Sequence, residues 1–290
     1  MLNIVVFDKE SPVGVILKNT AEQVGLHIHL VNSDEQGLVG DMFSVSEALD
    51  DAIDCLILVL GQGYSESTRF SQEGLVRLES YAREHDIPVV IQSSAAVFSG
   101  EPGYVFTEQD VPKPESAFGR YCWSVEQLFS GLNSRLVVRT GWLYSERSSD
   151  WFMRLIQDIE DGKALDFPAD QVGQPTSCHD LSRVLIAVIE QLNCSDDPEL
   201  WSVYHYASVD QVSKNRFCQT VINEMVIHAD FSEVTLDSTP YQQRAIADDF
   251  PQNSVLDCTK ILSVFGIKQR AWKREVSAII SKKFAETENS

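Results

Sequence analysis

The sequence predicts an α/β protein built on a Rossmann-type doubly wound parallel sheet, with a smaller lobe formed by the C-terminal part of the chain. Short apolar runs rich in β-branched residues alternate with segments of helical periodicity in the first half of the sequence. The first run, residues 2–7, leads directly into a loop and a helix, which is where a dinucleotide-binding sheet places its phosphate loop. A chain of 290 residues is long enough for one large domain and a smaller one.

The expected elements follow each other in a regular order. Strands are expected over residues 3–7, 27–31, 55–59, 88–92 and 135–139, and helices over residues 12–24, 44–51, 68–85 and 115–132. After about residue 145 the alternation stops and Gly, Pro and Asp become denser. We therefore assign residues 1–145 to a Rossmann-like domain and residues 146–285 mainly to a substrate-binding lobe, interleaved with late elements of the first domain. Residues 286–290 form a polar tail.

The charge and composition exclude several classes of partner. The chain has 43 acidic and 23 basic residues and a net charge of −20, which repels nucleic acids and anionic membranes. No apolar run approaches the ~20 residues that span a bilayer, and no basic targeting segment precedes the first strand, so we expect a cytoplasmic protein. The six cysteines lack a C-x-x-C pair and the histidines are isolated, so neither a metal site nor a disulfide framework is expected.

One basic stretch stands out near the C-terminus of this acidic chain. Its members are Lys268, Arg270, Lys273, Arg274, Lys282 and Lys283. A solvated helix face is the simpler interpretation, and a surface that meets an acidic ligand is the alternative.

Five segments, in order and at consistent spacing, resemble one family. They are residues 93–100 (SSAAVFSG), 139–144 (RTGWLY), 170–176 (DQVGQPT), 203–207 (VYHYA) and 251–257 (PQNSVLD), the last followed by Lys260, Phe265, Gly266 and Trp272. From end to end the chain resembles the dTDP-4-dehydrorhamnose reductase (RmlD-like) branch of the extended short-chain dehydrogenase/reductases. The resemblance implies a nucleotide-sugar pocket beside a nicotinamide cofactor. Phe250 stands where the family pattern has an arginine before the proline.

The catalytic positions depart from the family pattern. In the family, a tyrosine gives a proton to the substrate carbonyl, and a lysine four residues later lowers its pKa. The aligned residues here are Phe118 and Cys122, which can do neither. Tyr121 lies three residues from Phe118 on nearly the same helix face, but about 4.5 Å away along the axis, and Val125 stands where its lysine would be. We therefore expect Tyr121 to be a partly buried or rim aromatic residue and not a substitute acid.

The phosphate loop departs from the family pattern as well. The resemblance places the glycines of G-x-x-G-x-x-G at Asp8, Ser11 and Gly14, of which only the last is glycine. Asp8 brings a carboxylate to the place where cofactor phosphates would lie, and Pro12 removes a backbone N–H. A structural interpretation explains the same residues: Ser11 as the N-cap, Pro12 as the first helical residue and Gly14 as a close-packing position. We predict that no dinucleotide cofactor is bound; NADP or NAD would be the cofactor if one were. Residues 60–63 (LGQG) and Ser71 also differ from the family's cofactor wall.

The remaining site residues are implied by the same resemblance. Ser94 aligns with the catalytic Ser/Thr whose hydroxyl binds the substrate carbonyl; a hydroxyl bonded to nearby backbone at the strand end is the alternative. The expected wall of the substrate cleft consists of Arg139, Trp142, Gln171, Pro175, Thr176, Asn253 and Ser254. For Arg139 and Trp142 a salt-bridged strand end and a buried aromatic residue are equally good interpretations.

Three hypotheses follow. The first is a degenerate, non-catalytic member of the family that binds a nucleotide sugar or regulates through a protein partner or a second copy of itself. The second is an active NADP-dependent nucleotide-sugar reductase with a site rearranged around Ser94 and Tyr121. The third is a scaffold subunit, by analogy with the regulatory subunit of methionine adenosyltransferase, which has the same fold.

Overall fold

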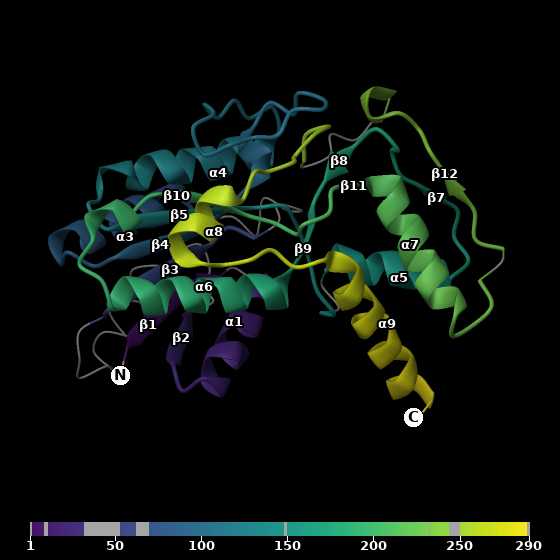
Figure 1. Ribbon diagram of the computed structural model, residues 1–290, viewed down its shortest axis with the longest axis horizontal. Helices are drawn as coiled ribbons and strands as arrows, with labels where there is room; N and C mark the ends of the chain where they lie inside the picture. Colours follow the sequence, from purple (N-terminus) through teal and green to yellow (C-terminus); the bar gives the residue numbers. More distant parts are fainter. Residues whose placement is uncertain are drawn as a thin grey trace.

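A six-stranded parallel sheet forms the centre of the larger domain (Figure 1). The structure is a computed structural model that describes residues 2–8, 11–31, 53–61, 70–147, 150–231, 233–243 and 250–288. The strands are β1 (Asn3–Asp8), β2 (His27–Val31), β3 (Cys55–Val59), β4 (Val89–Ser94), β5 (Arg135–Thr140) and β10 (Val203–Tyr206), in the spatial order β10-β5-β4-β3-β1-β2. The order reverses beside β1, and ligands of such sheets bind beyond the carboxyl ends of the strands at this point, here β1 and β3. The predicted fold class is confirmed.

Helices cover both faces of the sheet because its strands are apolar on both sides; every residue of β3 is buried. Helices α1 (Pro12–Gln23) and α6 (Cys178–Asn193) pack together on one face, and α3 (Gln72–Glu84) and α4 (Ala117–Leu128) lie on the other (Figure 1). Register ties the strand ends together: Asp8 is level with Val59, and Ser94 with Thr140.

The expected elements agree with the observed ones to within a few residues. The predicted helix over 115–132 ends at Leu128 and continues as a 3-10 turn, η3 (Phe129–Gly131). The predicted helix over 44–51 lies outside the described residues. The sheet gains its last strand, β10, and its covering helix α6 from sequence beyond residue 145. None of the helices in the described part of the chain is long and apolar enough to cross a bilayer.

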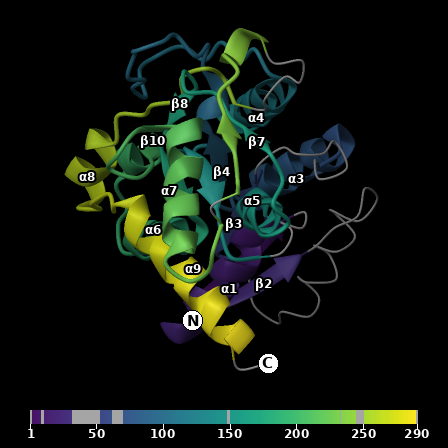
Figure 2. The same cartoon turned by 90° about the vertical axis from the view of Figure 1, so that its right-hand side faces the viewer.

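A second apolar cluster joins α5 (Trp151–Glu160), α7 (Lys214–Val226) and α9 (Trp272–Glu288), which stand side by side at one end of the molecule (Figure 2). Short strand pairs link this end to the sheet. They are β6 (Trp142–Tyr144) with β9 (Pro175–Ser177), β8 (Val172–Gly173) with β11 (Val212–Ser213), and β7 (Leu165–Asp166) with β12 (Leu236–Asp237). The short helix α8 (Thr259–Phe265) packs beside β10, and three further 3-10 turns are η2 (Ala95–Val97), η4 (Pro198–Leu200) and η5 (Tyr241–Gln243).

Candidate functional site

The carboxylate of Asp8 occupies the amino end of α1. Its Oδ1 accepts the N–H of Ser11 at 2.9 Å, and its Oδ2 accepts the Ser11 hydroxyl at 2.9 Å and the N–H of Gly14 at 2.6 Å. Asp8 is 1% exposed, and burial raises the pKa of its carboxyl to about 6 although these hydrogen bonds oppose the shift. The helix end therefore already holds a buried anion that belongs to the chain itself.

The neighbouring residues of the loop have the structural roles expected for them. Ser11 is the N-cap of α1 and accepts the N–H of Val13, and Pro12 is the first helical residue, so both predictions are confirmed. A Cβ on Gly14 would lie 2.3 Å from Oδ2 of Asp8. The predicted close contact at Gly14 is thus present, and the side chain of Asp8 makes it.

An aromatic cluster lies around Phe118, the residue that the family resemblance aligns with the proton donor. The ring of Phe118 is fully buried, and its centroid lies 6.2 Å from that of Phe250, which in turn lies 6.5 Å from Trp142. Cys122, one turn further along α4, is also fully buried. A Cβ on Gly119 would lie 2.0 Å from the carbonyl oxygen of Ala96, so α4 sits directly against η2. Three rings therefore meet where the resemblance places a phenol and a guanidinium.

The two hydroxyl candidates are both engaged with the backbone. Ser94 is 1% exposed, and its Oγ accepts the N–H of Ala96 at 3.1 Å, which confirms the structural interpretation of a hydroxyl that ends a strand. The hydroxyl of half-buried Tyr121 accepts the N–H of Phe70 at 3.1 Å, just before α3. Tyr121 therefore ties α4 to the start of α3.

Arg139, near the end of β5, forms a buried ion pair with Glu126 of α4. Its guanidinium donates to Glu126, with Nη2 to Oε2 at 2.7 Å and Nε to Oε1 at 3.1 Å, and the two side chains are 3% and 1% exposed. Ser93 donates to the same carboxylate at 2.6 Å. Burial, with the charge of Arg139, lowers the pKa of the nearby His205 to about 3 and keeps that ring neutral. This placement corresponds to the salt-bridged strand end that was the alternative to a cleft position.

The other predicted cleft residues mainly hold segments together. Nε2 of Gln171 donates to the carbonyl of Phe250 at 3.2 Å, and Nδ2 of Asn253 donates to the carbonyls of Glu101 and Tyr104 at 2.6 Å each. The remaining hydroxyls do the same over short distances: Ser254 donates to Val172 at 3.4 Å, and Thr176 donates to Gln174 at 3.2 Å. Pro175 is buried in β9, opposite Trp142 in the register of β6.

Lys214 is a residue of this region that the sequence did not reveal. It opens α7, its side chain is 6% exposed, and its ammonium lies 4.7 Å from the ring centroid of Trp142 and 4.6 Å from that of Trp151. Among the described residues, no carboxylate pairs with it. A lysine at a helix start is normally solvated, so only the positions of the two indoles reveal its burial.

A parallel sheet with this strand order, completed by a smaller lobe beyond its carboxyl edge, defines the extended short-chain dehydrogenase/reductase class of folds. Within it, the family model described as RmlD substrate binding domain matches residues 63–284, and the chain belongs to this family.

The similar proteins are mostly nucleotide-sugar reductases. The dTDP-4-dehydrorhamnose reductase of Aggregatibacter actinomycetemcomitans is 25% identical over 263 residues, which are 87% of this chain and 86% of that protein. A probable dTDP-4,6-dihydroxy-2-methyloxan-3-one 4-ketoreductase of Streptomyces antibioticus is 34% identical over 125 residues, 43% of this chain and 40% of the relative.

Solved structures agree in fold. A dTDP-4-dehydrorhamnose reductase from Clostridium acetobutylicum superposes with a TM-score of 0.81 at 20% identity, covering 97% of this chain and 99% of the other. The enzyme from Bacillus anthracis, solved in complex with NADP, gives a TM-score of 0.78 at 17% identity with the same coverage.

Proposed function

We propose that this member of the family does not reduce a sugar, and that it binds a nucleotide sugar or serves as a regulatory or scaffold subunit. The observation that carries the proposal is the packing of Phe118 on Phe250. Both rings are buried, and they meet where the family pattern has the proton donor and an arginine.

The reduction itself lacks a proton source at this position. Reducing a keto sugar delivers hydride to the carbonyl carbon and a proton to its oxygen, and a phenyl ring has no proton to give. General acid catalysis typically contributes about 10²- to 10⁴-fold in rate. A neutral thiol at Cys122 does not replace the charge of an ammonium group.

The residues at the amino end of α1 also do not fit the diphosphate of a dinucleotide. The N–H groups of Ser11 and Gly14 belong to the loop that would cradle it, and the carboxylate of Asp8 already accepts both. Two unit charges about 4 Å apart repel by about 4 kcal/mol at an effective dielectric constant of about 20. Pro12 offers no N–H.

Buried polar groups without a partner beside the aromatic cluster support a binding role. The indole N–H of Trp142 and Oε1 of Gln171 have no hydrogen-bond partner among the described residues, and the ammonium of Lys214 has no counter-ion there. A buried polar atom without a partner costs about 1–3 kcal/mol. A ligand that bears oxygens and negative charge would satisfy such groups.

The alternative, an active NADP-dependent nucleotide-sugar reductase with a rearranged site, is favoured by similarity that extends over 87% of this chain to a dTDP-4-dehydrorhamnose reductase. In that case Tyr121 would be the proton donor. Its hydroxyl would have to leave the N–H of Phe70 and turn towards Ser94.

Calorimetric titration with NADPH, NADH and a dTDP-sugar, together with an assay of NADPH oxidation by a 4-keto nucleotide sugar, separates these functions. We expect the sugar nucleotide to bind, neither cofactor to bind with micromolar affinity, and no turnover. Micromolar NADPH binding with turnover that Tyr121→Phe abolishes, and that Tyr104→Phe on an exposed loop leaves intact, would establish the alternative. If no small molecule binds, co-purification of a protein partner tests the scaffold role.

A further inference from the structure

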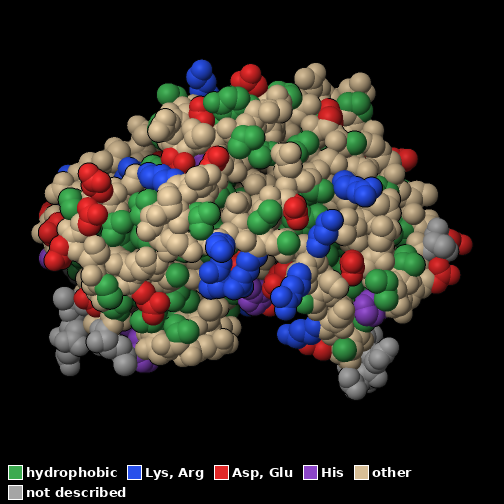
Figure 3. Space-filling view, viewed as in Figure 1, with side chains coloured by type: hydrophobic (Ala, Val, Ile, Leu, Met, Phe, Trp, Pro, Cys, Tyr) green, Lys and Arg blue, Asp and Glu red, His purple; other side chains and the backbone are tan. Residues whose placement is uncertain are grey.

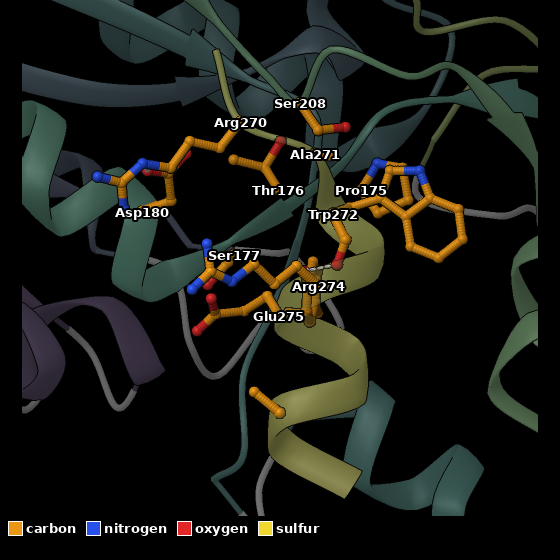
Figure 4. A pocket seen from close by; sticks show the side chains of 12 residues that line it. Pro175, Thr176, Ser177, Asp180, Ser208, Arg270, Ala271, Trp272, Arg274 and Glu275 are labelled. Carbon is orange, nitrogen blue, oxygen red and sulfur yellow. Dashed lines mark hydrogen bonds and ion pairs between the residues drawn. The ribbon is translucent and has the colours of Figure 1, made fainter. Parts of the chain in front are cut away.

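A pocket lies between the two lobes, where α6 and α9 begin (Figure 4). Its volume is about 720 Å³, within the ~300–1,000 Å³ typical of small-molecule sites. Its floor is β9, and its sides come from the first turn of α6, the loop after β10 and the segment 270–278. Two residues of the expected cleft wall, Pro175 and Thr176, line it from β9, but none of the three clustered rings around Phe118 does.

Two helix amino ends face this pocket. Helix α6 starts after its N-cap Ser177, and α9 starts at Trp272, and both residues line the cavity. The first N–H groups of a helix lack intrahelical partners and carry partial positive charge, so each helix end favours an anion. Both helix ends therefore favour a negatively charged ligand in this cavity.

Two arginines add full charges to these dipoles. Arg270 and Arg274 reach from the linker and from α9 towards the first turn of α6 (Figure 4). Among the described residues, Arg274 has no carboxylate partner. Arg270 shares Asp180 with Arg183, at 3.4 and 3.0 Å, and Asp180 also accepts the hydroxyl of Tyr206.

The charged residues that line the pocket balance: Arg270 and Arg274 stand against Asp180 and Glu275. Arg183, which pairs with Asp180 outside the lining, adds a third positive charge beside it. Residues 268–274 carry four of the 23 basic residues of a chain whose net charge is −20, and two of them, Arg270 and Arg274, line the pocket. Figure 3 shows Lys and Arg side chains gathered around the notch between the two lobes.

We propose that this pocket binds a small molecule with two adjacent phosphate groups. A guanidinium matches two phosphate oxygens with paired N–H donors, and two arginines beside two helix ends provide separate donors for two phosphates. The cavity is larger than one inorganic phosphate needs, which leaves room for the group that the diphosphate carries. The rings around Phe118 take no part in this site. Arg270 and Arg274, which belong to the basic stretch of the sequence, would contact the phosphates.

The test is isothermal titration with inorganic pyrophosphate in low salt. We expect binding that weakens about tenfold in Arg274→Gln and about a hundredfold in Arg270→Gln/Arg274→Gln, because each lost charge-assisted contact is worth about a factor of ten. The matched control is Lys273→Gln/Lys282→Gln, which removes two exposed charges from α9 outside the pocket and should leave the affinity within about twofold.

Each contrary result overturns the proposal. Equal weakening in both double variants indicates general attraction to a basic face, and unchanged affinity in the arginine variants places pyrophosphate elsewhere. An acidic peptide that binds where pyrophosphate does not makes the surface a protein contact. Thermal unfolding checks that the variants fold; Arg274→Gln alone keeps the test valid if the double variant does not, because Arg274 is exposed and has no ion-pair partner among the described residues. This proposal rests on pyrophosphate binding, and the proposed function rests on dTDP-sugar binding. If the double variant loses pyrophosphate but still binds a dTDP-sugar, the sugar nucleotide occupies the other site, so the two proposals can fail separately.

Discussion

The two sides of the molecule that could meet a small molecule are built in opposite ways. At the amino end of α1 and beside α4, the chain's own groups take the expected positions: a carboxylate at the helix end, and rings where the family resemblance places polar side chains. On the side where α6 and α9 begin, two helix ends and two arginines surround open volume. The difference teaches that one fold can fill its helix-end and proton-donor positions with its own groups and still present open volume with arginines elsewhere.

The largest effect is expected from breaking the buried ion pair between Arg139 and Glu126. Arg139→Met leaves Glu126 buried without a counter-charge, and we expect a loss of about 3–5 kcal/mol in the free energy of unfolding by urea. Arg77→Met, at an exposed pair with Glu73, should cost less than about 1 kcal/mol. A loss below about 1 kcal/mol for Arg139→Met would mean that water reaches this pair and that the two sides differ less than we describe.

The second effect concerns the pH dependence of Asp8. Because the pKa of this carboxyl is about 6 in the folded protein against 3.8 as the reference, the folded state holds the proton more tightly. Its contribution to stability is therefore fully present below about pH 4 and is lost as the pH rises through 6, by about 3 kcal/mol.

Urea unfolding of the wild type and of Asp8→Asn between pH 4 and 7.5 measures this contribution. The stability of the wild type relative to the variant should fall across that range. Asp150→Asn is the matched comparison, because burial raises the pKa of Asp150 to about 7 and shifts its own loss to higher pH. A pH-independent difference for Asp8→Asn would show that the carboxylate is solvated and the helix end open.

A smaller effect tests whether the cleft is filled. Phe118→Tyr puts a hydroxyl among buried rings, and we expect a loss of about 1–3 kcal/mol in thermal or urea unfolding. Arg274→Gln on the open side should stay within about 0.5 kcal/mol. If Phe118→Tyr is as stable as the wild type, the cluster has room and a polar partner for a phenol, and the active-reductase alternative gains support.

The smallest effect is expected at Lys214. Its ammonium has the two indoles as neighbours and no counter-ion among the described residues, so Lys214→Met should be neutral or stabilising by about 1 kcal/mol without ligand. The same variant should lose the rise in melting temperature caused by a dTDP-sugar. Lys163→Met, at an exposed pair on a loop, is the control for charge alone. If a dTDP-sugar raises the melting temperature of Lys214→Met as much as that of the wild type, Lys214 does not contact the ligand.

Local chemistry made much of the fold predictable. Strands appeared as apolar runs, and Ser11 with Pro12 marked the start of α1 because capping depends on neighbouring residues only. Phe118 and Cys122 lie on the helix that the sequence predicted there, and both are buried.

Contacts between distant segments set the limits of that prediction. The sequence could show that Phe250 replaces an arginine, but not that its ring reaches Phe118, 132 residues earlier. Likewise, the basic stretch gave no sign that Arg270 would lie beside Asp180 and β9, because a long crossover brings them together. The burial of Lys214 depends in the same way on Trp142, which comes from another strand pair.

The contact between Asp8 and Gly14 limits which residues homologues can carry at these two positions. With a Cβ at position 14 only 2.3 Å from Oδ2, an aspartate at position 8 and a side chain at position 14 exclude each other. Homologues with an aspartate at position 8 should therefore keep glycine at position 14, which gives the pattern D-x-x-S-x-x-G after the first strand. Within this pattern, aspartate and serine in place of the first two glycines distinguish homologues whose loop caps its own helix from those with the glycine-rich loop.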